Sequence, residues 1–211
     1  MIRVFVADDH AVVRRGLRQI LEAEGMSVPV EGGTADEVLA GVEGRTADVL
    51  VLDLSLPGGN GLDLLKEVKR RRPELPVLIL TVHSEDQYAV RALRAGASGY
   101  LTKDMAPEML VQAIRKVYRG GRFVTPALAE RLVMHLHDDP EKPPHESLSN
   151  REFEVLRSLA SGRTVSEAAE AMGLSVKTVS TYRTRILEKM NMKTNAELTH
   201  YAIRNGLVED A

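Results

Sequence analysis

Hydrophobic positions in the first 121 residues alternate between short apolar runs and longer amphipathic stretches. A short, Val-rich apolar run predicts a strand buried on both faces, and apolar residues at helical spacing predict the helix that follows it. Strict alternation of strands and helices implies right-handed crossovers and therefore a parallel sheet. The expected strands are residues 2–7, 28–30, 49–53, 77–81 and 99–101, and the expected helices are residues 10–24, 34–42, 62–72, 87–95 and 107–118.

The pattern changes after residue 121. Residues 122–147 have room for one helix, near 127–136, followed by a polar, Pro-rich stretch that we interpret as an extended or mobile linker. Residues 148–211 show no strand pattern and predict four helices. Their expected N-terminal signals are capping boxes at 149–152 and 164–167, then Ser175, then Asn195. Because three residues, 173–175, join the second and third of these helices, the spacing is that of a helix-turn-helix.

Composition narrows the function classes. The chain has 44% hydrophobic residues, enough for a core, but no Cys, which excludes disulfides and thiolate chemistry. Trp is absent and aromatics are 4%, which argues against an aromatic base-stacking surface. No apolar run reaches the ~18 residues of a membrane span and the start lacks a signal-peptide pattern, so we expect a soluble cytoplasmic protein. Net charge is −2, yet residues 175–193 hold five basic side chains and one acidic one.

Charged and hydroxyl side chains fall at the carboxyl ends of the predicted strands. Asp8 and Asp9 follow the first strand, Asp53 ends the third, Thr81 ends the fourth and Lys103 follows the fifth. In an open parallel sheet these ends converge on one crevice. Taken singly, each residue also has a plainer interpretation, such as a helix cap or a loop charge. Their joint placement favours a site.

The chemistry of that site follows from its residue types. Three crowded carboxylates repel one another, and Mg²⁺ resolves this because it takes carboxylate oxygens and shares a phosphate oxygen. A carboxylate beside a metal and a Lys can act as a nucleophile towards a phosphoryl group. Lys103 would neutralise the transferred charge, and the Thr81 hydroxyl would donate to the new oxygens.

Asp8-Asp9, Asp53 with Pro57-Gly58, Thr81, and Lys103 preceded by Tyr100 together resemble the receiver domain of two-component response regulators, over about residues 1–120. The resemblance implies a flavodoxin-like (βα)₅ parallel-sheet domain, here residues 1–121, that accepts a phosphoryl group from a cognate sensor histidine kinase. It implies these roles: phosphoacceptor Asp53; Mg²⁺ ligands Asp8, Asp9, Asp53 and the Ser55 carbonyl; phosphoryl-holding Lys103; switch pair Thr81 and Tyr100. Val82 departs from the smaller residue that many receivers carry after the switch Thr.

The third helix of the second domain is basic on one side. Its apolar face is expected to hold Val176, Val179, Ile186, Leu187 and Met190. After a tight turn, such a helix is typical of a recognition helix whose N-terminal half lies in the DNA major groove. Arg183 falls within the apolar arc, where we expect its stem to pack while the guanidinium reaches a phosphate. The candidate DNA-contacting residues are Lys177, Thr178, Ser180, Thr181, Arg183, Thr184 and Arg185.

Residues 148–156, 167–169 and 177–182 resemble the LuxR-type helix-turn-helix, and with the receiver they make the chain similar to NarL/FixJ-subfamily response regulators. Tyr182 stands where many members have His. The resemblance implies a small all-α four-helix output domain, residues 148–211, that binds double-stranded DNA, forms a homodimer on phosphorylation or on DNA, and works with RNA polymerase. The dimer contact would come from Glu197, Leu198, Tyr201 and Ala202.

Two other function classes remain open. One is an aspartyl-phosphate phosphotransferase or phosphatase, but the haloacid-dehalogenase type needs a second Asp two residues after the nucleophile, where this chain has Ser55. The other is a regulator that acts through protein contacts alone, against which the basic helix argues. We therefore expect a phosphorylation-dependent DNA-binding transcription regulator, and no enzyme beyond its own phosphorylation and dephosphorylation at Asp53.

Overall fold

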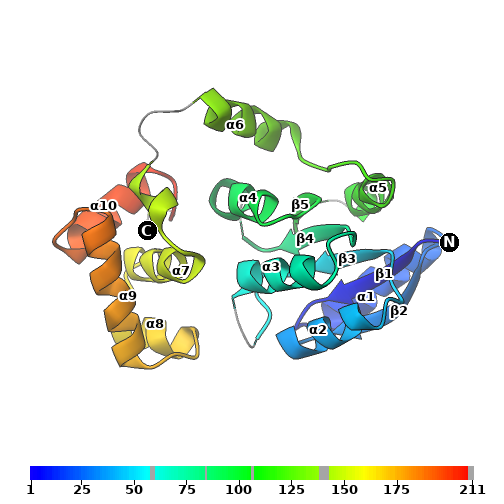
Figure 1. Cartoon of the computed structure of the whole chain (residues 1–211), viewed down its shortest axis with the longest axis horizontal. Coiled ribbons are helices and arrows are strands. Elements are labelled where there is room, and N and C mark those ends of the chain that lie inside the picture. Colours follow the sequence, from blue (N-terminus) through cyan, green and yellow to red (C-terminus); the bar gives the residue numbers. More distant parts are fainter. Residues whose placement is uncertain (58–59, 84, 106, 138–142, 209–211) are drawn as a thin grey trace. The chain divides into compact units, whose positions relative to one another are not determined.

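A computed structural model of the chain describes residues 1–57, 60–83, 85–105, 107–137 and 143–208. The chain forms two compact units, Met1–Val133 and Met134–Ala211. Figure 1 shows the first as a sheet flanked by helices and the second as a group of helices. Part of the predicted linker, residues 138–142, and Gly58 of the Pro57-Gly58 motif lie outside the described residues.

The first unit is a parallel sheet with strand order β2-β1-β3-β4-β5 in its described residues, as the alternating pattern predicts. The flavodoxin-like fold class is confirmed. The strand order reverses between β1 and β3, because β2 lies on one side of β1 and β3 lies on the other. Proteins with α/β folds bind ligands at the carboxyl ends of the strands beside such a reversal. The strands are β1 Arg3–Ala7, β2 Ser27–Gly32, β3 Val49–Leu52, β4 Val77–Thr81 and β5 Gly99–Thr102. The helices between and after them are α1 Ala11–Ala23, α2 Ala35–Glu43, α3 Gly61–Arg71, α4 Glu85–Arg94 and α5 Pro107–Tyr118.

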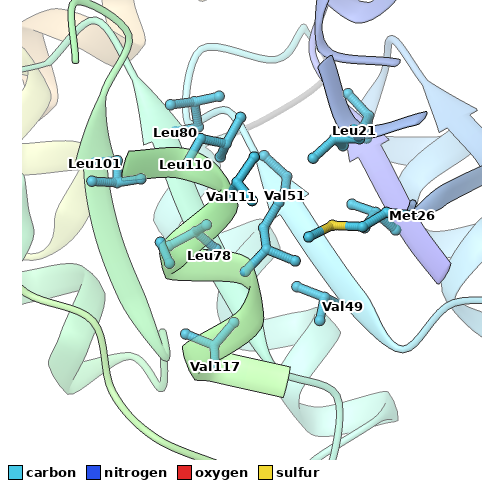
Figure 2. Packing of buried hydrophobic residues seen from close by; sticks show 14 of the residues in the cluster. Leu21, Met26, Val49, Val51, Leu78, Leu80, Leu101, Leu110, Val111 and Val117 are labelled. Carbon is cyan, nitrogen blue, oxygen red and sulfur yellow. The ribbon is translucent and has the colours of Figure 1, made fainter. Parts of the chain in front are cut away.

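Alternate residues of each strand face opposite layers of helices. On one face, Val51 of β3 and Leu78 of β4 pack with Leu21 of α1 and Val111 of α5, and Figure 2 shows these side chains meeting between sheet and helices. Each buried side chain of this size stabilises the fold by about 1.5–3 kcal/mol. On the other face, the ring of Phe5 lies so close to α2 that a Cβ at Gly41 would come within 2.6 Å of it.

The first residues of the expected linker belong to the first unit. The amide of Phe123 donates to the carbonyl of Ser98 (2.9 Å), and the amide of Tyr100 donates to the carbonyl of Phe123 (3.2 Å). Phe123 thereby forms an isolated parallel bridge with Gly99 of β5. The predicted helix near 127–136 is present as α6, Pro126–His137, with the Thr125 hydroxyl accepting from the amide of Leu128 (3.2 Å).

The second unit is helical throughout its described residues. Both predicted capping boxes are present: Ser149 with Glu152, and Thr164 with Glu167. Ser175 caps α9 as predicted, but the prediction for the last helix is wrong by one residue, since the side chain of Thr194 caps it. The elements are the 3₁₀ turn η1 Pro144–Ser147, α7 Asn150–Ala160, α8 Val165–Ala171, α9 Val176–Lys189 and α10 Asn195–Arg204.

The core of the second unit is built where α7 packs against α9 and α10. Phe153 of α7, Ile186 of α9 and Leu198 of α10 are essentially inaccessible to solvent. The predicted apolar face of α9 is wrong at its first residue: Val176 is 50% exposed. A helical pattern assigns a face to each residue but does not show where the partner helices end, and in the described part of the chain Val176 is only half covered.

Candidate functional site

The register of the sheet brings the predicted acidic residues together. Ala7 of β1 pairs with Leu52 of β3, and the amide of Asp53 donates to the carbonyl of Ala7 (2.9 Å), so Asp8 and Asp53 leave neighbouring strands side by side. Thr81 of β4 pairs with Thr102 of β5, and the next amide, that of Lys103, donates to the carbonyl of Thr81 (2.8 Å).

One ammonium group joins two buried carboxylates at this edge. The Nζ of Lys103 lies 2.6 Å from Oδ2 of Asp53 and 2.6 Å from Oδ2 of Asp8. Asp53 and Asp8 are 1% and 2% exposed. Burial opposes the charged form of Lys103, but its hydrogen bonds to both carboxylates and their charges outweigh that cost, and the pKa of Lys103 is raised above its ordinary value. A ligand that binds at this edge of the sheet therefore meets a fixed positive charge that lies between two carboxylate oxygens.

The remaining carboxylate oxygens are held by backbone amides. Oδ1 of Asp8 accepts from the amide of His10 (2.9 Å), and Oδ1 of Asp53 accepts from the amide of Ser55 (3.0 Å). The guanidinium of Arg14, on α1, donates to the carbonyl of Asp8 (2.6 Å). These bonds fix the two side chains before any ligand arrives, which is the preorganisation that electrostatic catalysis needs.

Asp9 lies at the more open rim of this pocket, beside a histidine that we did not predict. Nδ1 of His10 is 2.6 Å from Oδ1 of Asp9, and the ligand atoms of Asp8, Asp9 and His10 lie within 4.8 Å of one another. Carboxylate oxygens are the ligands that Mg²⁺ prefers, so the donor set fits that ion. The sequence offers one sign that His10 belongs to this pocket, namely its position directly after two acidic residues.

The predicted switch residues converge on another residue that we did not predict. Thr81 and Tyr100 are both fully buried, and the Tyr100 hydroxyl donates to the carbonyl of His83 (2.9 Å). The amide of His83 lies 3.5 Å from Oγ1 of Thr81, and its ring stacks on Tyr88 of α4 at 4.5 Å. Val82, which lies between Thr81 and His83 in the chain, is 68% exposed. Its side chain, larger than the residue that many receivers have here, therefore does not pack inside the fold.

The candidate DNA-contacting residues lie along one side of α9. Lys177, Ser180, Thr181, Thr184 and Arg185 are exposed, and Thr178 is half-buried. Because the positive charges of Lys177 and Arg185 are both exposed, this surface is suited to binding a polyanion.

Arg183 makes a contact within the domain that we did not predict. It is half-buried, and its Nε donates to Oδ1 of Asn195 at 2.6 Å, which ties α9 to the start of α10. This hydrogen bond uses Nε of Arg183, and the expected contact of its guanidinium with a phosphate stays a prediction.

The predicted dimer contact is wrong for two of its residues. Leu198 and Ala202 are 0% exposed, since this face of α10 packs against α7. Glu197 is exposed, and Tyr201 is half-buried with its hydroxyl 2.7 Å from Nδ1 of His145. Residues four apart on a helix share a face, and here that face is the inner one.

Within the part of the chain that the structure describes, no helix combines the length and apolar character needed to cross a membrane.

Comparison with known proteins gives the same division of the chain. Residues 4–115 match the family described as response regulator receiver domain, and residues 146–202 match that described as bacterial regulatory proteins, luxR family. The chain is 38% identical over 210 residues to the response regulator UvrY of Escherichia coli K12, covering 98% of this chain and 96% of that protein. It is 36% identical over 213 residues to the response regulator GacA of Pseudomonas aeruginosa PAO1, covering 100% of both.

Solved structures agree with these matches. The structure of RcsB from Salmonella enterica serovar Typhimurium, bound to promoter rprA in the presence of the phosphomimetic BeF₃⁻, superposes with a TM-score of 0.67 at 29% identity, covering 95% of this chain and 97% of that one. Another solved structure holds two RcsB dimers bound to two parallel DNAs, with a TM-score of 0.59 at 30% identity, covering 95% of this chain and 96% of that one.

Proposed function

Since the chain belongs to the response regulators that join a receiver domain to a LuxR-type DNA-binding domain, we propose that Asp53 is its phosphoacceptor and that phosphorylation controls its binding to DNA. The chain is a DNA-binding transcription regulator of a two-component system, as its relatives are, and not an enzyme. The observation that best supports Asp53 is its place directly after the central strand β3, with the ammonium of Lys103 2.6 Å from its Oδ2.

The reaction follows from this geometry. A carboxylate oxygen of Asp53 forms a bond to phosphorus while the bond from phosphorus to the donor breaks and the donor leaves with its electron pair. Lys103 then balances the charge of the transferred oxygens, and the Thr81 hydroxyl donates to one of them. Asp8, Asp9, Asp53 and the Ser55 carbonyl would hold Mg²⁺, which when bound supplies a second positive charge to the phosphoryl oxygens.

Labelling with acetyl phosphate and Mg²⁺ tests the assignment. Asp53→Asn keeps the shape of the side chain but removes the nucleophilic oxygen, so labelling should fall to background in intact-protein mass spectrometry. Asp36→Asn, in the exposed first turn of α2, is the matched control and should be labelled like the wild type. Stoichiometric labelling of Asp53→Asn would overturn the assignment.

The exposed side of α9 supports a DNA contact by the same logic of charge. Lys177 and Arg185 carry fixed positive charges outward, and each cation placed on a phosphate releases counterions. We expect Lys177→Ala and Arg185→Ala each to weaken binding and to reduce the slope of log K against log salt by about one unit if the lost contact is to phosphate. Lys66→Ala, on α3 of the other unit, should change neither value. Wild-type affinity in both α9 variants would place another surface against DNA.

The remaining partners follow from the family. We propose a sensor histidine kinase as the phosphoryl donor, a second copy of this chain as the partner on DNA, and RNA polymerase as the partner at the promoter, with the cytoplasm as the compartment. The promoter-bound and dimeric structures of RcsB support the DNA and dimer assignments. Of the predicted dimer residues, Glu197 and Tyr201 keep surface on α10 that a second copy could contact.

A further inference from the structure

The outer side of α9 contains a shallow hollow that its charges alone do not explain. The hollow has a volume of about 280 Å³ and is lined by Lys177, Thr178, Thr181, Tyr182 and Arg185. Its two cations are the phosphate-binding candidates. Between them lie two threonines and an aromatic ring, side chains that are partly apolar.

The threonine hydroxyls of this face are already hydrogen-bonded within the helix. Oγ1 of Thr181 donates to the carbonyl of Lys177 (3.0 Å), and Oγ1 of Thr184 donates to the carbonyl of Ser180 (3.2 Å). Oγ1 of Thr178 lies 2.8 Å from Oγ of the capping Ser175. Each hydroxyl has one proton, so Thr181 and Thr184 use theirs on α9 itself. What exposed Thr181 offers a ligand is a methyl group and a lone pair.

The first turn of the helix adds another aliphatic group. Val176 is 50% exposed, so half of its surface is open to a ligand. The N-terminal half of a recognition helix lies nearest the bases. This half of α9 therefore combines aliphatic groups with flanking positive charges, and lacks a free hydroxyl proton at Thr181.

Among the four bases, only thymine has an apolar group, its C5 methyl, on its major-groove edge. We propose that the hollow receives the C5 methyl group of a thymine in each half-site and that Thr181 is the residue that determines this specificity. Lys177 and Arg185 position the helix on the DNA through their positive charges. The methyl group of Thr181 and the ring of Tyr182 form the apolar contact with the thymine. This inference rests on the proposed entry of α9 into the major groove.

The test compares thymine with uracil, which differs only by that methyl group. The probe is the tightest-binding duplex selected from a random-sequence pool with the acetyl-phosphate-treated full chain. Each thymine of that duplex is then replaced, one at a time, by deoxyuridine. At one thymine per half-site, the affinity should fall roughly three- to fivefold, the scale expected for burying one methyl group.

Variants of the same position separate methyl from hydroxyl. Thr181→Ser keeps the back-bonded hydroxyl and loses the methyl, so its affinity should be equal for thymine and uracil. Thr181→Val keeps a methyl and loses the hydroxyl, so it should still prefer thymine. Thr184→Ser makes the same chemical change outside the hollow and should discriminate like the wild type.

The possible outcomes distinguish a failure of this inference from a failure of the proposed DNA contact of α9. If no duplex is enriched and all sequences bind alike, the proposed DNA contact of α9 fails, and the inference fails with it. If a duplex is enriched and bound specifically, but no thymine is sensitive to uracil or Thr181→Ser still discriminates, the inference is wrong and the DNA contact stands.

Discussion

At the scale of single residues, the pocket depends on one cation shared by two buried anions. We expect Lys103→Met, measured without divalent ions, to lower the free energy of unfolding by roughly 3 kcal/mol, because Asp8 and Asp53 lose the charge that compensates their burial. The raised pKa of Lys103 means that this contribution is complete below the ordinary Lys pKa and is lost only as pH rises through the raised value. The loss should therefore be the same at pH 6 and pH 9 in urea unfolding.

Adding Mg²⁺ provides the second half of this measurement. A divalent cation can replace the missing ammonium, so Mg²⁺ should raise the melting temperature of Lys103→Met more than that of the wild type. Lys66→Met removes an exposed lysine 3.6 Å from Asp63 and should change stability little. Equal Mg²⁺ responses in all three proteins would argue against a metal site among these carboxylates.

At the scale of elements, α7 begins with a carboxylate that also holds α9. Glu152 is 3% exposed, closes the capping box with Ser149, and lies 2.6 Å from Nζ of Lys189. Burial raises its pKa, but the hydrogen bonds from Lys189 and Ser149 outweigh this, so the pKa of Glu152 lies below its ordinary value. Its stabilisation is therefore present above the ordinary Glu pKa and is lost as pH falls through the lowered value.

The prediction is that Glu152→Gln costs about 1 kcal/mol at pH 7, since Lys189 is partly solvated and the pair is screened. The difference from the wild type should shrink as the pH falls through the lowered pKa of Glu152, because the carboxylate then becomes protonated. Urea unfolding, followed by circular dichroism at several pH values, measures it. Glu167→Gln alters the corresponding box of α8, where no lysine pair is described, and should show a weaker pH dependence. A pH-independent loss in Glu152→Gln would show that the charge of Glu152 does not carry the effect.

At the scale of the whole molecule, the effect of the proposed phosphorylation at Asp53 has to reach the DNA-binding unit. The hydroxyls of Thr81 and Tyr100 both approach His83, so an inward shift of Thr81 towards a phosphoryl group would disturb the segment that leads into α4. We expect phosphorylation to raise the dimer population and to increase operator affinity by roughly 10²-fold, because the second half-site contact becomes intramolecular.

Thr81→Ala should be labelled at Asp53 yet gain neither dimer nor affinity, and Thr81→Ser, which keeps the hydroxyl, should gain both. Light scattering gives the mass, and titration of the selected duplex gives the affinity. Wild-type gains in fully labelled Thr81→Ala would show that the signal leaves the pocket by another route.

The sequence by itself determined which helices and strands form and which strand ends carry the residues of the site. Strand-length apolar runs ending in Asp8, Asp53 and Lys103 predict a parallel sheet, and parallel strands bring their carboxyl ends to one edge whatever the details of packing. Capping boxes were equally predictable, because the hydrogen bonds between Ser149 and Glu152 span only three residues.

Only the tertiary structure decided which side chains are covered and where their hydrogen bonds go. Leu198 and Val176 are both apolar residues of amphipathic helices, but Leu198 is 0% exposed in the helix that packs against α7, whereas Val176 is 50% exposed. Arg183 bonds to Asn195 of the next helix, and the Tyr100 hydroxyl bonds to the carbonyl of His83, through contacts between different elements of the chain. Periodicity assigns a residue to a face of its own helix or strand, whereas burial and long-range hydrogen bonds depend on which other segment lies against that face.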